Sequence, residues 1–398
     1  MKSKKWSMPV IMASLALFYL AQPYFFWHSI LSDLVVRVAM TFTVGFAFWL
    51  NRKSLNHYEF FLIIFLFVLT ILYAFTSGRN IVYYLTLLPI LFLPFSKEKF
   101  HVNVFNSFLT IYVIFIGLSL ISHAFALMGI ISPYTTIPPL NELKDYNYYV
   151  YPFLVRPSLS SLRFCGIFDE PGVVGTLSGI MLCIKGLNFR DYKSVILLIS
   201  GLASLSLFFY ILIAVYFALY SAILKRSTSR IVMYLLLISS FIYATNNVTV
   251  LSELIGERIV WDTEKGSLSG DNRINIDKAE YYISFISGNT KTLLFGIENK
   301  VLYKEDVAGS SSIFNVFIIN GVVFLFSYIL FFLLYAFRYK LNMVSWLMFT
   351  FVFIGTIYQR PYTFQFLPVF LFITLAKVSQ LRIQDEQIIV KKNVYNGK

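Results

Sequence analysis

The sequence predicts an all-α fold, that of a polytopic integral membrane protein with about 12 transmembrane helices. Apolar segments, separated by short basic connectors, make up most of the chain. A hydrocarbon core about 30 Å thick requires about 20 apolar residues per helix, and most of the segments approach that length. The composition agrees, because 58% of the residues are hydrophobic and only 13% are charged, whereas soluble domains carry about 25% charged residues.

The helices are expected where the apolar segments lie. The first follows a basic start and lacks the small-residue cleavage site of a secretory signal, so we interpret it as a membrane span. The run 194–224 is long for one span and short for two, and we divide it at residues 203–206, where serine hydroxyls can satisfy freed backbone groups. The expected helices cover residues 8–27, 33–50, 58–77, 80–95, 104–131, 168–186, 194–205, 207–224, 231–248, 313–335, 342–358 and 362–378.

The basic connectors predict the orientation, because lysine and arginine favour the cytoplasmic side of short loops. If the N-terminus is cytoplasmic and 194–224 forms two helices, almost all of these connectors are cytoplasmic. The short outer turns then carry only Arg79 and Arg360. A single span at 194–224 would move the later basic connectors outside. We therefore expect both termini to be cytoplasmic and residues 1–398 to form a single transmembrane domain.

Two long polar loops are expected on the outer side of the membrane. The first, 132–167, is rich in tyrosine and proline and is predicted to be an irregular cap. The second, 249–312, has apolar residues at helical spacing between Ile276 and Ile286 and is predicted to contain a short amphipathic helix. Asp271 or Asn272 would be its N-cap.

The formal charge of +13 does not indicate a nucleic-acid partner. The basic residues follow the connectors, as the positive-inside rule requires, and form no stripe with interleaved aromatic residues. Cys165 and Cys183 would lie about 27 Å apart along one helix, which excludes a disulfide between them there. The sequence has no metal-binding or nucleotide-binding motif, so we expect neither a metal nor a cofactor.

The densest group of polar residues near the outer surface is the segment 163–172, where the first loop enters a helix. Asp169 and Glu170 would be stabilised by the helix dipole, and Pro171 suits the first helical turn. One interpretation is structural: the carboxylates cap the helix and pair with Arg163. The other is functional: Arg163 holds an anionic group beside a carboxylate that accepts a proton. The residues alone leave both open.

Arginines gather on the predicted outer side. An arginine fork binds phosphate in a bidentate manner, which lysine cannot do. Each arginine alone is as well explained by a solvated loop charge, but the set favours a site for a membrane-bound polyanion such as a lipid pyrophosphate. The set consists of Arg156, Arg163, Arg258, Arg273 and, in the last outer turn, Arg360.

Three stretches of the chain resemble the O-antigen polymerase (Wzy-type) family, which is related to the O-antigen ligases. The pattern Arg163-x-x-Gly166-x-Phe168-x-Glu170-Pro171 is similar to the family's helix-opening pattern after the first large periplasmic loop. Asp271-Asn272-Arg273, followed by an amphipathic helix and Leu293-Leu294-Phe295-Gly296, is similar to the second-loop signature. The stretch from Ser310 to Asn320-Gly321 matches the point where that loop re-enters the membrane.

The resemblance implies a metal-independent glycosyltransferase of the bacterial inner membrane, with its active site facing the periplasm. Such an enzyme moves a growing glycan from undecaprenyl pyrophosphate to the non-reducing sugar of another lipid-linked repeat unit of a surface polysaccharide. The expected partners are this lipid-linked oligosaccharide, the bilayer and a membrane protein that regulates chain length.

The resemblance also implies roles for the polar residues. Arg163 and Arg273 would clamp the pyrophosphate, and Glu170 would accept the proton of the acceptor hydroxyl. Asp169 and Asp271 are weaker candidates for this base. The residues expected to complete substrate binding are Arg156, Arg258, Arg360, Asp169, Asp271, Asn272 and Ser310.

The chain departs from the related patterns at two places. Ligases usually carry His-Asn where this sequence has Ser310-Ser311, which favours a polymerase. The Arg-x10-Gly spacing of some polymerases is not kept after Arg163 or Arg273. An O-antigen ligase, or a flippase that transports the lipid-linked oligosaccharide, therefore remains an alternative function.

Overall fold

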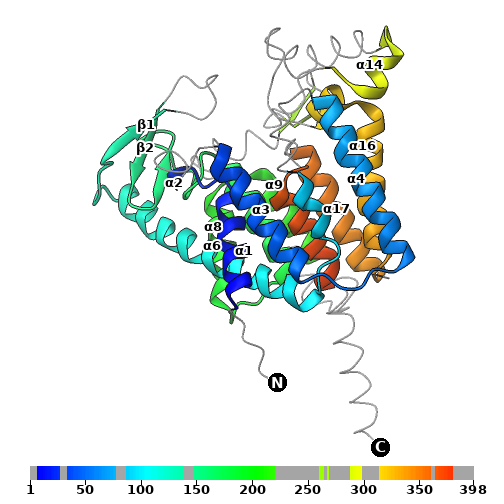
Figure 1. Ribbon diagram of the computed structural model, residues 1–398. Helices are drawn as coiled ribbons and strands as arrows, with labels where there is room; N and C mark the ends of the chain where they lie inside the picture. The colour runs from blue at the N-terminus through cyan, green and yellow to red at the C-terminus, as the bar shows by residue number, and fades with distance from the viewer. Residues whose placement is uncertain are drawn as a thin grey trace, which may run out of the picture. The chain divides into compact units, whose positions relative to one another are not determined.

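The computed structural model describes residues 7–26, 34–77, 87–138, 147–219, 260–263, 267–268, 287–297, 313–339, 341–359 and 364–379. Their secondary structure is mainly helical, with five short strands in the described ranges (Figure 1). The chain divides into two compact units, which we describe separately. The first combines Met1–Leu55, Pro89–Ile213 and Phe366–Lys398, and the second combines Asn56–Leu88 and Ala214–Gln365.

The described helices support a membrane protein. Three contain segments that are long and apolar enough to cross a bilayer, namely His57–Ala74, Glu98–Leu127 and Val316–Phe337. Seven apolar helices of the described ranges are shorter, with 10–17 residues. The total of about 12 spans, the periplasmic position of the loops and the orientation of the termini stay predictions.

Helix α1 (Met8–Leu20) is central to the first unit, because it packs against both α3 (Leu34–Leu50) and α6 (Glu98–Leu127). Helix α6 also packs against α8 (Tyr192–Ala203), and α8 packs against α7 (Pro171–Lys185). The last described helix, Phe366–Ser379, joins the same core. Its Phe370 ring stacks on His101 of α6, with 4.8 Å between the ring centroids.

Prolines and left-handed residues end several helices earlier than the apolar runs predict. The expected helix 8–27 stops at Leu20, because Gln22 has φ 58° and Pro23 disfavours helical geometry before it. A short second helix, α2 (Tyr24–Phe26), follows. The expected helix 104–131 instead runs from Glu98 to Leu127. Gly129 follows two residues after the end of this helix, and its φ of 69° suits a glycine beyond a helix C-terminus.

Two other helix predictions have different outcomes. The predicted helix 80–95 is wrong in its described part, where Leu88–Phe92 forms a 3-10 turn (η2) followed by further turns. Pro89 and Pro94 cannot donate the backbone hydrogen bonds of an α-helix there. The predicted break at 203–206 is confirmed, since α8 ends at Ala203 and α9 (Leu207–Leu219) begins after it.

The first polar loop was predicted to be irregular, but this prediction is wrong. The loop contains a three-stranded antiparallel sheet. Its strands are β1 (Thr135–Ile137), β2 (Tyr148–Tyr151) and β3 (Leu154–Arg156). Pro152 and Phe153 form the tight β2–β3 turn, with φ 56° at Phe153. The sheet packs on Tyr24 of α2, beside the helices of the first unit (Figure 1). The strands are too short for the sequence to show a clear alternation of apolar and polar residues.

In the second unit, α4 (His57–Ser77) packs on α16 (Ile313–Phe337). Buried Glu59 forms an ion pair with Arg338, and Tyr58 Oη donates to Leu334 O at 3.0 Å. Helix α17 (Met343–Gln359) packs on α16, and the short helix α14 (Thr290–Phe295) does so too. The remaining strands, β4 (Trp261–Asp262) and β5 (Ser267–Leu268), pair with each other. The predicted amphipathic helix around 276–286 lies outside the described residues.

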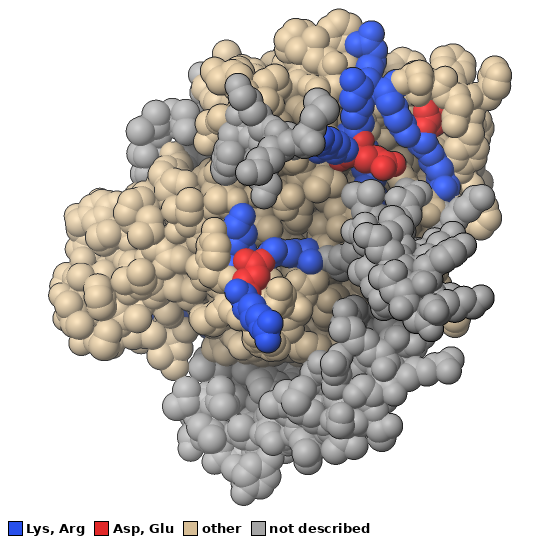
Figure 2. Space-filling model, turned by 90° about the horizontal axis from the view of Figure 1, so that it is seen from below, with Lys and Arg blue, Asp and Glu red and all other residues tan. Residues whose placement is uncertain are grey.

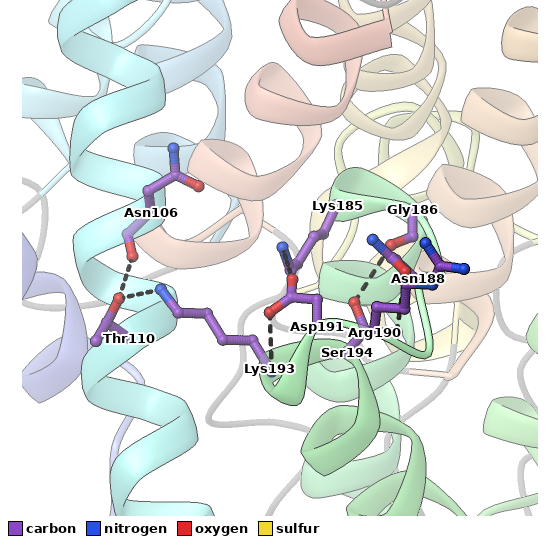
Figure 3. Close-up of polar contacts among 9 residues, drawn as sticks. All are labelled: Asn106, Thr110, Lys185, Gly186, Asn188, Arg190, Asp191, Lys193 and Ser194. Carbon is purple, nitrogen blue, oxygen red and sulfur yellow. Dashed lines mark hydrogen bonds and ion pairs between the residues drawn. The ribbon is translucent and has the colours of Figure 1, made fainter.

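The turn between α7 and α8 is held by charged side chains (Figure 3). Asp191 caps α8 by accepting from Lys193 N at 3.2 Å, and it forms an ion pair with Lys185 at the end of α7. Lys193 Nζ donates to Thr110 Oγ1 of α6 at 2.5 Å. The turn therefore neutralises part of its own charge and connects α7, α8 and α6.

Asp191 should contribute stability at neutral pH that disappears in acid. Burial raises its pKa, but hydrogen bonds from Lys185 and the Lys193 backbone, with the charges of both lysines, hold it below its ordinary value of 3.8. A carboxyl whose pKa is lower in the folded state stabilises above its ordinary pKa and loses that effect as pH falls through the folded value. Asp191→Ala, which also removes the cap, should cost about 1 kcal/mol at pH 7.

Thermal unfolding in detergent at several pH values tests this expectation. The difference in unfolding temperature between Asp191→Ala and the original protein should become smaller as pH falls below the ordinary pKa of 3.8. Asn188→Ala, in the same turn but outside the ion pair, is the control. A difference that does not depend on pH would contradict the assigned role of the carboxylate charge.

Candidate functional site

The first stretch of the family resemblance forms a buried connection at the centre of the first unit. From Phe164 to Phe168 every residue is buried. Its backbone bonds to three different elements: Phe164 N donates to Ala203 O at the end of α8, Val155 N of β3 donates to Gly166 O, and Phe25 N of α2 donates to Ile167 O. This segment therefore fixes the position of the polar residues on either side of it, Arg163 and Asp169.

The two carboxylates lie at the start of α7, as predicted. Pro171 is the first residue of this helix and Glu170 its N-cap, although the Glu170 side chain makes no capping hydrogen bond. Both Asp169 and Glu170 are half-buried. Burial, and then the negative charge of Asp169, raise the pKa of Tyr24 to about 12. The charge of Asp169 therefore acts on Tyr24 of α2. The capping interpretation of Glu170 receives no support from a side-chain hydrogen bond.

Among the described candidate residues, Arg156 has the environment that differs most from the one predicted from the sequence. It was expected as one of the exposed binding arginines, but the strand β3 carries it into the interior and leaves it 1% exposed. Its Nη2 donates to Ser161 O at 2.5 Å, and its guanidinium lies 5.7 Å from the Tyr151 ring centroid. Its buried Nε has no hydrogen-bond partner among the described residues, and no described carboxylate pairs with its charge.

His123 of α6 lies beside this arginine. Its Nε2 is 3.3 Å from Leu162 O, and its ring packs edge-on against Phe164. The positive charge of Arg156 acts on the imidazole. The buried Nδ1 of His123 has no partner in the described part of the chain. Arg156 and His123 thus contact adjacent carbonyls of one turn, which supports a structural role for His123.

The turn held in this way leads directly to Arg163. This residue is half-buried, and its charge acts on Tyr210 of α9. Arg163 is therefore more accessible to a ligand than Arg156 and remains the better candidate for direct contact with an anion. We refer to His123, Arg156, Ser161, Leu162 and Arg163 as the outer cationic cluster, after the side of the membrane that the sequence predicts for this loop.

The other predicted site residues are not placed by the structure. Arg258, Asp271, Asn272, Arg273, Ser310 and Arg360 lie outside the described residues. Whether the second loop brings its arginines to the outer cationic cluster therefore stays a prediction.

The second and third stretches of the resemblance do meet each other, within the second unit. Ile297 N donates to Ile318 O at 2.8 Å, next to Gly296 and Gly321. Gly296 has φ 79° and ψ −172°, and Gly321 has φ 74° and ψ 172°, a region that is open essentially to glycine alone. The backbones approach so closely that a Cβ on Gly321 would lie 2.2 Å from Leu294 O.

Sequence reasoning missed a buried polar cluster at the other end of α6. His101 Nδ1 and Nε2 contact Ser96 Oγ (3.0 Å) and Thr374 Oγ1 (2.7 Å). Lys377 Nζ donates to Ser96 O at 3.1 Å and Ser96 Oγ at 3.0 Å. All four residues are completely buried. The available signal was Lys377 itself, a charge at the end of an apolar run, where a charge is costly unless it has partners.

Comparisons with known proteins identify no relative. No family model, curated protein or solved structure matches this chain. Within the described ranges, no group of three or more His, Cys, Asp or Glu residues is arranged to hold a metal ion.

Proposed function

We propose that the protein is a membrane glycosyltransferase that polymerises lipid-linked oligosaccharide repeat units. The growing glycan leaves undecaprenyl pyrophosphate and is joined to the non-reducing sugar of another lipid-linked unit, on the periplasmic side of the inner membrane. The support comes from the family resemblance of three stretches and from the charge of the outer cationic cluster.

The buried charge of Arg156 is the observation that carries the proposal. A guanidinium cannot lose its proton in a protein, and burying it away from water without a counter-ion is costly. Arg156 has one carbonyl and one tyrosine ring as partners among the described residues. With Arg163 seven residues later, it makes the cluster strongly cationic, and an anionic substrate group bound nearby would compensate this charge.

The arrangement assigns different roles to the two arginines. Arg163, which is half-buried, would contact the donor pyrophosphate and stabilise the charge that develops as the anomeric carbon–oxygen bond breaks. Arg156 would add to the positive field and position the turn that precedes Arg163. The Glu170 carboxylate would accept the proton of the attacking sugar hydroxyl, which then forms the new bond to the anomeric carbon. Arg273 would supply the second guanidinium.

Chain lengthening in proteoliposomes tests the reaction. The purified protein, supplied with lipid-linked repeat units alone, should produce a ladder of longer glycans. A flippase would move these units without changing their length, and a ligase would require a different acceptor. If no lengthening occurs while the units cross the bilayer, the transporter alternative is correct and the polymerase proposal fails.

Glu170→Gln tests the proposed base in the same assay. The amide keeps the size of the side chain but cannot accept the proton, so turnover should fall on the order of 100-fold or more. Asp169→Asn is the matched control, because it removes the neighbouring carboxylate, whose charge acts on Tyr24, and it should matter less. Normal turnover of Glu170→Gln, with the fall in Asp169→Asn instead, would move the role of the base to Asp169.

A further inference from the structure

A group of exposed basic residues lies away from the candidate site, where α3 ends and α6 begins. Two backbone hydrogen bonds hold the segments 51–53 and 95–97 side by side. Lys53 N donates to Phe95 O (3.0 Å) and Lys97 N donates to Asn51 O (2.9 Å), and together they form an isolated antiparallel bridge between Arg52 and Ser96. This pairing brings Arg52, Lys97 and Lys99, from distant parts of the sequence, to one surface. We call these three residues the basic corner.

Within the described ranges, the charges of the basic corner are not paired with carboxylates, unlike the charge of Lys185 in the α7–α8 turn. Figure 2 shows Lys and Arg side chains gathered in groups on one face, with acidic side chains among them. In the α7–α8 turn, Lys185 is paired with Asp191 and Lys193 donates to Thr110 (Figure 3). Arg52, Lys97 and Lys99, by contrast, are exposed and form no ion pair with any residue that the structure describes.

The position of these cations makes their repulsion worse. Lys97 is the N-cap of α6 and Lys99 belongs to its first turn. The N-terminus of a helix carries about half a positive charge, so cations there are disfavoured and an anion is favoured. Glu98 is the only acidic residue of this first turn. Glu98 offsets only one of the positive charges gathered here, so a bound anion would reduce the repulsion that remains.

Exposed aromatic rings lie next to the charges. The Arg52 guanidinium lies 4.7 Å from the centre of the Trp49 ring, and its Nη1 donates to Trp49 O at 3.1 Å. Trp49 stacks with Phe46, one turn earlier on α3, and these side chains are 39% and 59% exposed. Tryptophan beside basic residues is typical of the boundary between the acyl chains and the headgroups of a bilayer.

We propose that the basic corner binds the headgroup phosphate of an anionic phospholipid. The lipid acyl chains would lie along the exposed rings of Phe46 and Trp49, and the phosphate would lie over Arg52, Lys97 and Lys99. The adjacent apolar surface favours a lipid over a free phosphate ion. The charge favours an anionic lipid over a zwitterionic one, because each basic residue near a membrane surface strengthens binding to anionic lipid about fivefold.

The test is thermal unfolding of the purified full chain in zwitterionic detergent. Phosphatidylglycerol should raise the unfolding temperature, whereas phosphatidylcholine or inorganic phosphate at the same concentration should not. The double variant K97Q/K99Q leaves the contacts of Arg52 with Trp49 in place and should weaken the apparent affinity for phosphatidylglycerol on the order of 30-fold. The control R190Q/K291Q removes two exposed charges elsewhere and should keep the original response.

Three outcomes would overturn the proposal: a full response in K97Q/K99Q, an equal loss in the control, or equal stabilisation by inorganic phosphate. If K97Q/K99Q does not fold, the proposal is tested instead by how salt changes the stabilisation of the original protein by phosphatidylglycerol. Stabilisation by phosphatidylglycerol should weaken as salt is raised from 0.05 to 0.5 M, because salt screens exposed charges over a Debye length of about 10 Å at 0.1 M. A response that does not change with salt would exclude an electrostatic site.

Discussion

Arg163→Ala should abolish polymer formation while the protein still reaches the membrane. Arg163 is half-buried and follows a turn that Arg156 and His123 hold through the carbonyls of Ser161 and Leu162. Removing one preorganised group that stabilises developing charge costs on the order of 10²–10³ in rate. Arg163→Lys should recover only part of this loss, because an ammonium group lacks the planar fork that binds two phosphate oxygens.

The measurement is chain lengthening per molecule of purified enzyme, with membrane content determined separately. Arg190→Ala, which removes an exposed arginine from the α7–α8 turn, is the control and should keep full activity. Arg156→Gln is expected to behave differently, lowering both activity and the amount of folded protein, because Arg156 is 1% exposed. Full-length glycan from Arg163→Ala would refute the pyrophosphate clamp.

Gly321→Ala should prevent the second unit from folding. Alanine at φ 74° and ψ 172° is strained, and its Cβ would lie 2.2 Å from the backbone oxygen of Leu294. Strain of this kind costs about 1–3 kcal/mol, and forcing extra volume into a packed site costs about 1–3 kcal/mol more. Because the opposing atom belongs to the backbone, no side-chain rotation can relieve the contact.

Monodispersity and unfolding temperature after mild detergent extraction measure this effect. Gly117→Ala is the matched control: its Cβ would meet Ile196 Cδ1 at 3.6 Å, an ordinary contact, within the regular helix α6. It should leave stability unchanged or slightly increased, since alanine favours helices over glycine. A Gly321→Ala variant as stable as Gly117→Ala would mean that α14 and α16 do not meet in this way.

Local features of the fold could be predicted because they depend on neighbouring residues. Apolar runs located most of the described helices, and the serine-containing break between α8 and α9 was confirmed. Pro171 was predicted within the first turn of α7, where the structure places it. Prolines also explain the main local error, since Pro89 and Pro94 prevent an α-helix over residues 87–95.

The environment of the arginines could not be predicted, because it depends on contacts between distant segments. Arg156 looks like a loop charge in the sequence, but pairing of β3 with β2 carries it inward, opposite Tyr149. The close approach of Gly321 to the Leu294 backbone likewise joins the predicted second loop to helix α16. Short strands and close backbone approaches leave no periodic signal in the sequence. The sequence analysis therefore predicted neither the sheet nor the close approach between α14 and α16.

The buried contacts of the last helix have a consequence for biosynthesis. The first unit begins at the N-terminus, yet Thr374 and Lys377 supply partners to Ser96 and His101 in its interior. While the ribosome is still translating the middle of the chain, these partners do not exist. The buried polar groups of Ser96 and His101 therefore lack these partners until residues 374–377 have been synthesised, and this part of the first unit can complete its packing only after that point.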